Sequence, residues 1–214
     1  MTHLPTQAGF NADPYGVALD NNGFIGGAQI GYNFQSGSLV YGVEADLQYS
    51  NAKDRLGFGP LALFGGALQA GSFGIANSEL RALGTVRARL GVTVGSALIY
   101  VTGGLAFGKI DDFSRSQYGG GVGGAFDAFN YIGTTDSWRT GYALGAGLEY
   151  AISQNWSLKG EYLYYNLGDH SVIGNPVTPN APFQTRNNWS NDGHIARVGV
   201  NYRFGGAGPV VARY

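Results

Sequence analysis

A chain of 214 residues is long enough for one all-β domain and short for two. Its net charge of -1, from 13 basic and 14 acidic residues, excludes a general electrostatic attraction to nucleic acid. The lack of cysteine excludes disulfides and thiolate chemistry, and 37 glycines with 14 tyrosines and 12 phenylalanines are typical of a β-barrel or β-sandwich, not of a disordered chain.

From Gly23 onward, apolar residues alternate with polar or small ones. In the second such segment, Tyr41 and Val43 alternate with Gly42 and Glu44. A period of two predicts strands whose two faces meet different environments. The pattern predicts seven strands, at residues 23–34, 39–50, 79–93, 97–109, 137–151, 156–167 and 196–204.

The connections between these segments alternate between short and long. Short turns at 35–38, 94–96 and 153–155 separate long connections at 51–78, 111–136 and 168–191. In an antiparallel meander this order places the short turns at one end and the long loops at the other, which is typical of outer-membrane barrels. The sequence therefore predicts an all-β, antiparallel up-and-down transmembrane β-barrel over residues 23–204. Residues 1–22 are expected to form an outer loop, and 205–214 a C-terminal tail.

Seven strands are one fewer than an even-numbered barrel requires, since single-chain bacterial barrels have even numbers of strands. We expect an eight-stranded architecture whose first strand is missing from this chain; the alternative is a stunted eighth strand at 15–19. Residues 1–5 lack the charged and apolar regions of a signal peptide, so either that peptide has been removed or the protein is not exported. No apolar run approaches the roughly 20 residues of a membrane helix.

The polar face of the predicted strands carries charges of both signs. The interior of an eight-stranded barrel is just wide enough to be filled by side chains, and buried charges must be paired. We therefore expect a salt-bridged plug with little or no bulk diffusion. The residues of this expected lumen network are Glu44, Asp46, Arg87, Arg89, Arg139, Glu149, Lys159, Glu161, Arg197 and Arg203.

The apolar face carries aromatic residues at both ends of the strands. Two such rings with aliphatic residues between them indicate the girdles that lie at the two membrane interfaces. The ring at the short-turn end contains Tyr32, Phe34, Tyr41, Tyr150, Trp156, Tyr202 and Phe204. The ring at the loop end contains Phe24, Tyr49, Phe107, Trp138 and Tyr164.

These blocks resemble a known family. Residues 23–33, 85–91, 100–108, 145–151, 155–162 and 198–204 look like the small outer-membrane immunogenic proteins (RopB-like porin family) of alphaproteobacteria. The resemblance implies a structural protein of the Gram-negative outer membrane that supports envelope integrity and presents surface loops as antigens. It also implies outer-membrane lipids and lipopolysaccharide as surroundings, and the outer-membrane insertion machinery as a partner that reads a terminal aromatic such as Phe204. A signal peptide and a first strand with a Trp-Thr-Gly-Phe-Tyr-like run, which the family normally has, do not appear in this sequence.

No residue cluster predicts catalysis, a metal or a cofactor. His3, His170 and His194 share no metal-ligand spacing. The glycine-rich residues 119–124 match a dinucleotide-binding pattern without its flanking strand and helix, and are interpreted as a loop tip. Asp169 and Ser171 flank His170 near the outer rim, which leaves a lipid-modifying enzyme as a minor alternative, although sequence neighbours do not make a triad.

The same strands are also compatible with a soluble ligand-binding barrel. A lipocalin-like barrel would turn them inside out, with the apolar face around a small ligand and the charged face in water. Self-association of the chain is a separate possibility, because a missing first strand would leave unpaired sheet edges.

Overall fold

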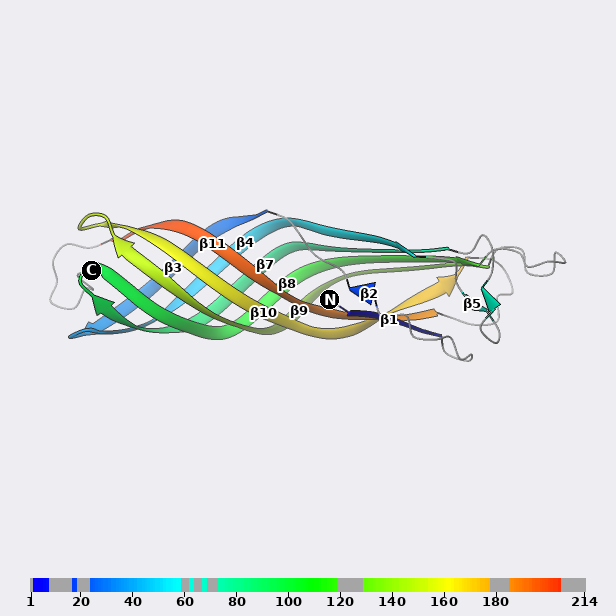
Figure 1. Cartoon of the computed structure of the whole chain (residues 1–214), viewed down its shortest axis with the longest axis horizontal. Helices are drawn as coiled ribbons and strands as arrows, with labels where there is room; N and C mark the ends of the chain where they lie inside the picture. The colour runs from blue at the N-terminus through cyan, green and yellow to red at the C-terminus, as the bar shows by residue number, and fades with distance from the viewer. Residues whose placement is uncertain are drawn as a thin grey trace.

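The computed structural model describes residues 2–7, 17–18, 24–58, 62–63, 67–68, 73–118, 129–177 and 185–204. Seven long strands lie side by side in one sheet that curls around the long axis of the molecule (Figure 1). Each long strand is antiparallel to the next long strand along the chain. They are β3 (Ile25–Ser36), β4 (Leu39–Phe58), β7 (Phe73–Val94), β8 (Ala97–Tyr118), β9 (Phe129–Ala151), β10 (Trp156–Pro176) and β11 (Thr185–Tyr202). The predicted all-β, up-and-down architecture and its seven strands are confirmed. Within the described ranges, no helix is long and apolar enough to cross a membrane.

Tight turns join the strands at one end of the molecule. Gly37 and Gly95 each occupy the first position of a two-residue turn, with φ of 63° and 61°. Glycine adopts this left-handed conformation without a Cβ clash, and such turns match the twist of a hairpin. Because successive strands are antiparallel, the short turns lie at a single end of the molecule, as predicted.

The strands extend farther toward the loop end than predicted. The ladder between β8 and β9 runs without interruption from Ala97↔Tyr150 to Tyr118↔Phe129. The predicted long connections were therefore wrong in part, because 51–58, 73–78, 111–118, 129–136, 168–176 and 185–191 are strand. In 111–117 and 130–136, for example, polar residues occur on both faces, so the sequence has no period-two contrast to reveal the strand there.

The N-terminal residues contribute two short strands at the loop end. β1 (Thr2–Gln7) pairs antiparallel with β11 from Leu4↔Asn188 to Gln7↔Thr185, and β2 (Val17–Ala18) pairs with β1. β2 therefore does not act as the eighth barrel strand that 15–19 was considered to supply. The sheet order is β2-β1-β11-β10-β9-β8-β7-β4-β3, and a separate two-stranded ribbon joins β5 (Ala62–Leu63) to β6 (Ala67–Leu68).

The two faces of the long strands meet opposite environments. Outward residues such as Leu144 and Leu148 are half exposed, whereas inward residues such as Glu44 and Arg87 are buried. A lipocalin-like barrel requires the reverse arrangement, so that architecture is excluded. The residues 119–124 and the tail 205–214 lie outside the described residues.

Candidate functional site in the barrel interior

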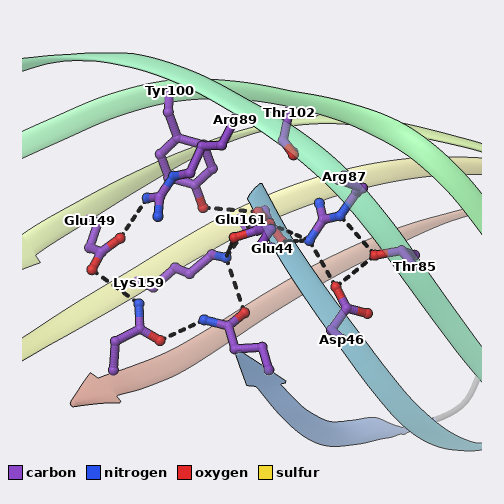
Figure 2. Close-up of polar contacts among 12 residues, drawn as sticks. Glu44, Asp46, Thr85, Arg87, Arg89, Tyr100, Thr102, Glu149, Lys159 and Glu161 are labelled. Atoms are coloured by element: carbon purple, nitrogen blue, oxygen red, sulfur yellow. Dashed lines mark hydrogen bonds and ion pairs between the residues drawn. The ribbon is translucent and has the colours of Figure 1, made fainter. Parts of the chain in front are cut away.

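A network of ion pairs crosses the interior near its turn end. Arg87, on β7, is fully buried, and its Nη2 lies 2.5 Å from Glu44 Oε1 and 2.9 Å from Asp46 Oδ2, both on β4. The same nitrogen lies 3.3 Å from Glu161 Oε2 on β10. Figure 2 shows Arg87 pointing inward toward these carboxylates. One guanidinium therefore links strands that are not neighbours in the sheet.

Two further cations bind the same carboxylates. Lys159 Nζ lies 3.1 Å from Glu44 Oε2 and 3.2 Å from Glu161 Oε1. Arg197, on β11, lies 3.1 Å from Asp46 and also contacts Glu161. Glu161 is thus shared by three cations, and its burial does not leave its charge uncompensated.

A second ion pair lies beside this group. Arg89 Nη2 is 2.5 Å from Glu149 Oε2, and Glu149 also accepts hydrogen bonds from Ser157 and Asn201. The guanidinium of Arg89 stacks over the ring of Tyr100 at 3.7 Å from its centroid, and the Tyr100 hydroxyl donates to Glu161 at 2.9 Å. Tyr100 therefore connects the two ion-pair groups (Figure 2).

Alternation on the strands and one glycine make this arrangement possible. Arg87 and Arg89 are two residues apart on β7, so both project to the same side of the sheet. The ring of Tyr100 lies over Gly147 on β9, where a Cβ would collide with the Tyr100 hydroxyl and ring. Gly147 thus leaves the space in which a large aromatic fills the lumen.

The structure brings together eight of the ten expected lumen charges. The group contains four acids and four bases, so its formal charge is balanced: Glu44, Asp46, Glu149, Glu161, Arg87, Arg89, Lys159 and Arg197. The remaining two lie elsewhere. Arg139 is half-buried, pairs across the sheet with Gly108, and joins none of these ion pairs in the described part of the chain. Arg203 lies at the turn end, where its backbone and that of Asn155 are hydrogen-bonded.

An apolar layer lies next to the ion pairs on the loop side, and the sequence pattern did not predict it. Its buried residues are Leu80, Leu83, Ala106, Ile110, Ala143, Leu163, Tyr165, Leu167 and Ile195. Leu163 and Tyr165 follow Glu161 on the inner face of β10, and Leu83 lies inward on β7. In the run 162–165 both faces carry large apolar or aromatic residues, so the sequence does not distinguish the inner face there.

A polar cluster lies farther toward the loop end. His170 Nε2 is 2.7 Å from Asp112 Oδ2, and Ser78 Oγ donates to Asp112 Oδ1 at 2.8 Å. Asn191 Nδ2 lies 2.8 Å from His170 Nδ1. This buried cluster joins four strands, but the sequence neighbours of His170, Asp169 and Ser171, are exposed on the other face. The two sequence neighbours considered with His170 are therefore not its partners.

The predicted aromatic residues all lie on the outer face. At the turn end, the rings of Phe34 and Tyr41 are stacked, with 5.5 Å between their centroids. The rings of Trp156 and Tyr202 meet edge to face, with 4.9 Å between their centroids. At the loop end, the ring centroids of Phe107 and Trp138 are 6.4 Å apart. Phe107 and Tyr164 are half-buried, and the other ten are exposed: Phe24, Tyr32, Phe34, Tyr41, Tyr49, Trp138, Tyr150, Trp156, Tyr202 and Phe204.

The apolar outer band ends where charged side chains begin. Two ion pairs lie on the outer surface just beyond Phe107 and Trp138. Arg81 Nε is 2.5 Å from Asp111 Oδ2, and Lys109 Nζ is 3.3 Å from Asp136 Oδ2. Among the residues with described side chains, no group of three or more histidine, aspartate or glutamate residues has the geometry of a metal site. His194 lies on the outer surface against Tyr162, and the side chain of His3 lies outside the described residues.

Comparison with known proteins agrees with this arrangement of faces. The family model described as "Outer membrane protein beta-barrel domain" matches residues 6–204. The chain belongs to this outer-membrane β-barrel family. It is therefore a bacterial outer-membrane protein, and short turns in such barrels face the periplasm while long loops face outward.

Outer-membrane proteins of several bacteria are similar in sequence to this barrel. The 31 kDa outer-membrane immunogenic protein of Brucella melitensis biotype 1 is 38% identical over 187 residues, which are 85% of this chain and 67% of the relative. The 22 kDa outer membrane protein of Rhizobium leguminosarum bv. viciae is 31% identical, over 76% of this chain and 63% of its own length. The 25 kDa outer-membrane immunogenic protein of Brucella abortus biovar 1 is 27% identical, over 83% and 64%. The expected resemblance is confirmed, and the chain spans about two thirds of these relatives.

One solved structure aligns with the structure of this outer-membrane barrel over most of both chains. It is that of Ail, the attachment invasion locus protein of Yersinia pestis, which covers 95% of this chain and 92% of its own at 15% identity. The TM-score between the two structures is 0.31.

Proposed function

We propose that this protein is a structural outer-membrane barrel that supports the envelope, presents surface loops, and has a lumen closed by its own side chains. The observation that carries the proposal is the balanced network of eight charges around Arg87 and Glu161, of which seven are buried and Arg197 is half-buried. An ion moving along the axis would have to separate these pairs, and the apolar layer around Leu83 and Leu163 adds a second barrier. Bulk diffusion in porins uses barrels of about 16–18 strands.

The outer surface supports the envelope part of the proposal. Aliphatic residues between two aromatic rings give the barrel a band that matches the hydrocarbon core, and lipids and lipopolysaccharide are its expected partners. Phe204 lies just beyond the end of β11 and is the aromatic that we expect the insertion machinery to contact during assembly.

We propose no catalytic role for this protein. His170 has a carboxylate partner, Asp112, and is buried in the interior beside Asp112 and Asn191. A lipid substrate outside the barrel would not reach this side chain. Mass spectrometry of lipid A from cells with and without the protein tests the point. Identical lipid species are expected, and a modified species dependent on the protein would refute a purely structural role.

Conductance in planar bilayers tests the closed lumen. The refolded full chain should give no large, steady open current, because the paired charges and the apolar layer both oppose the passage of an ion. Replacing one internal pair without changing the net charge, R89S with E149S, should raise ion conductance. The matched control, R81S with D111S, removes a pair from the outer surface and should leave conductance unchanged. A large, steady current through the unaltered chain would overturn the proposal.

A further inference from the structure

A buried histidine joins four strands beyond the outer edge of the membrane band. His170 follows Tyr164 of the loop-end aromatic ring by about 20 Å of extended strand, so it lies outside that ring. Its Nε2 is 2.7 Å from Asp112 Oδ2 on β8, and its Nδ1 is 2.8 Å from Asn191 Nδ2 on β11. Ser78 on β7 donates to the other oxygen of Asp112 at 2.8 Å. This cluster is separate from the ion-pair network, because the apolar layer lies between them.

The same asparagine holds a bulge in β10. The ladder between β10 and β11 shifts register around Gly168, whose φ is 78°. Gly168 N donates to Asn166 Oδ1 at 2.8 Å, and Gly168 O accepts from Asn191 Nδ2 at 3.3 Å. A β-bulge bends its strand and redirects side chains. Asn191 therefore connects His170 to the point where β10 changes course.

The contacts of Asn191 indicate which nitrogen of His170 carries the proton. An amide nitrogen only donates, so Nδ1 of the ring accepts, and the proton of the neutral ring lies on Nε2 and is donated to Asp112. A second proton would lie on Nδ1 and face the amide hydrogens of Asn191. Rotating that amide by half a turn removes the repulsion, because Oδ1 then faces Nδ1. Asn191 Oδ1 is buried and accepts no hydrogen bond from the described residues, so it is available for this contact.

Protonation of His170 changes the two sides of the cluster in opposite directions. The contact with Asp112 becomes an ion pair between buried groups, and charge-assisted hydrogen bonds are roughly twice as strong as neutral ones. The bond from Asn191 to Gly168 O is lost, because the amide nitrogen has turned away from it. The cluster thus has two arrangements, and the proton on Nδ1 decides between them.

Few charged groups surround His170. Asp112 is its direct carboxylate partner, and β7 contributes an uncharged serine. On β9 the charged residue of the inner face at this end is Arg139, which is half-buried, and on β11 Asp192 is half-buried beside the asparagine. The side chains of 52–56 on β4 lie outside the described residues.

We propose that His170, Asp112 and Asn191 form a proton-sensitive latch at the outer end of the barrel. With a neutral ring, Asn191 holds the bulge at Gly168. With a charged ring, the amide of Asn191 turns, the bulge is released, and His170 binds Asp112 more tightly. Histidine ordinarily changes charge between about pH 5 and 8, so acidification of the surroundings loosens the rim where β10 and β11 leave for the last surface loop.

NMR spectra of the full chain in lipid nanodiscs test the proposal. The ring nitrogens of His170 should show the proton on Nε2 alone at about pH 8 and protons on both nitrogens at about pH 5. The side-chain amide signals of Asn191 should move with the same midpoint. Protection of the Gly168 amide against hydrogen exchange should fall by about fivefold over that range, because the bulge loses one neutral hydrogen bond. A ring that keeps its charge state, or a Gly168 protection that does not follow the ring, would overturn the proposal.

Histidine variants assign the pH dependence to one residue. H170Q keeps a side chain that can donate to Asp112 but does not titrate, so the protection of Gly168 should no longer vary with pH. The matched control, H3Q with H194Q, removes the other two histidines and should leave the variation unchanged. Variation that persists in H170Q, or disappears in the control, contradicts the latch.

N191L tests the part played by the amide. Leucine has a similar size and no polar group, so His170 can still titrate but has nothing to turn. Protection of Gly168 should then be low and independent of pH. If it still falls on acidification, the amide does not transmit the change and the proposed coupling is wrong.

Discussion

At the level of single residues, Arg87 makes three ion pairs from a fully buried position. Replacing it by methionine leaves the buried carboxylates of Glu44, Asp46 and Glu161 with fewer cations. We expect R87M to lower the free energy of unfolding by about 3–5 kcal/mol, as measured by urea titration in lipid vesicles. R81M removes a half-exposed cation from the outer surface and should cost less than about 1 kcal/mol. Equal costs for the two variants would contradict the assigned burial of Arg87.

Gly147 offers a second test at the same scale. A methyl group there would collide with the ring of Tyr100, so G147A should destabilise the barrel by about 1–3 kcal/mol through overpacking. Adding Y100L should recover part of the loss, because the smaller side chain removes the collision. G160A is the control, since a Cβ at Gly160 meets nothing within 4 Å. If G147A and G160A unfold at the same urea concentration, the proposed contact is wrong.

At the level of elements, β9 passes from apolar surroundings to water along one face. Leu144 and Thr134 both point outward, but Leu144 lies midway between Trp138 and Tyr150, and Thr134 lies in the extension beyond the apolar band. L144R should cost about 2–4 kcal/mol of folding free energy in lipid vesicles, because an arginine at the bilayer centre is poorly solvated. T134R should cost almost nothing. A similar loss for both would place the membrane band elsewhere.

Sequence alternation predicts the membrane part of each strand and fails beyond it, for a physical reason. Between Tyr41 and Tyr49 one face meets lipid and the other a charged interior, so the contrast is strong. In 111–118 and 129–136 the outer face meets water, and polar residues occur on both faces. The backbone still forms a regular ladder there, because hydrogen bonding does not depend on that contrast.

At the level of the whole molecule, the charged residues on the inner face allow most of the interior to be recognised from the sequence. The apolar part of the interior cannot be recognised in this way. Glu44, Arg87 and Glu161 are recognisable because charged residues on one face of a strand need a polar or paired environment. Leu163 and Ile195 are not recognisable, since an apolar residue fits both lipid and a packed interior. Arg139 shows the opposite error, because a charge on the expected face does not ensure a place in the network.

The arrangement of the two faces is tested most directly by a cysteine scan of β9 from Ser137 to Ala151. The chain has no cysteine of its own, so each variant reports one position. Fluorescent labels at 138, 140, 142, 144, 146, 148 and 150 should be quenched by quenchers attached to lipid acyl chains, and labels at the odd positions should not. Equal quenching at even and odd positions, or quenching at the odd positions alone, would contradict a barrel with lipid outside and paired charges within.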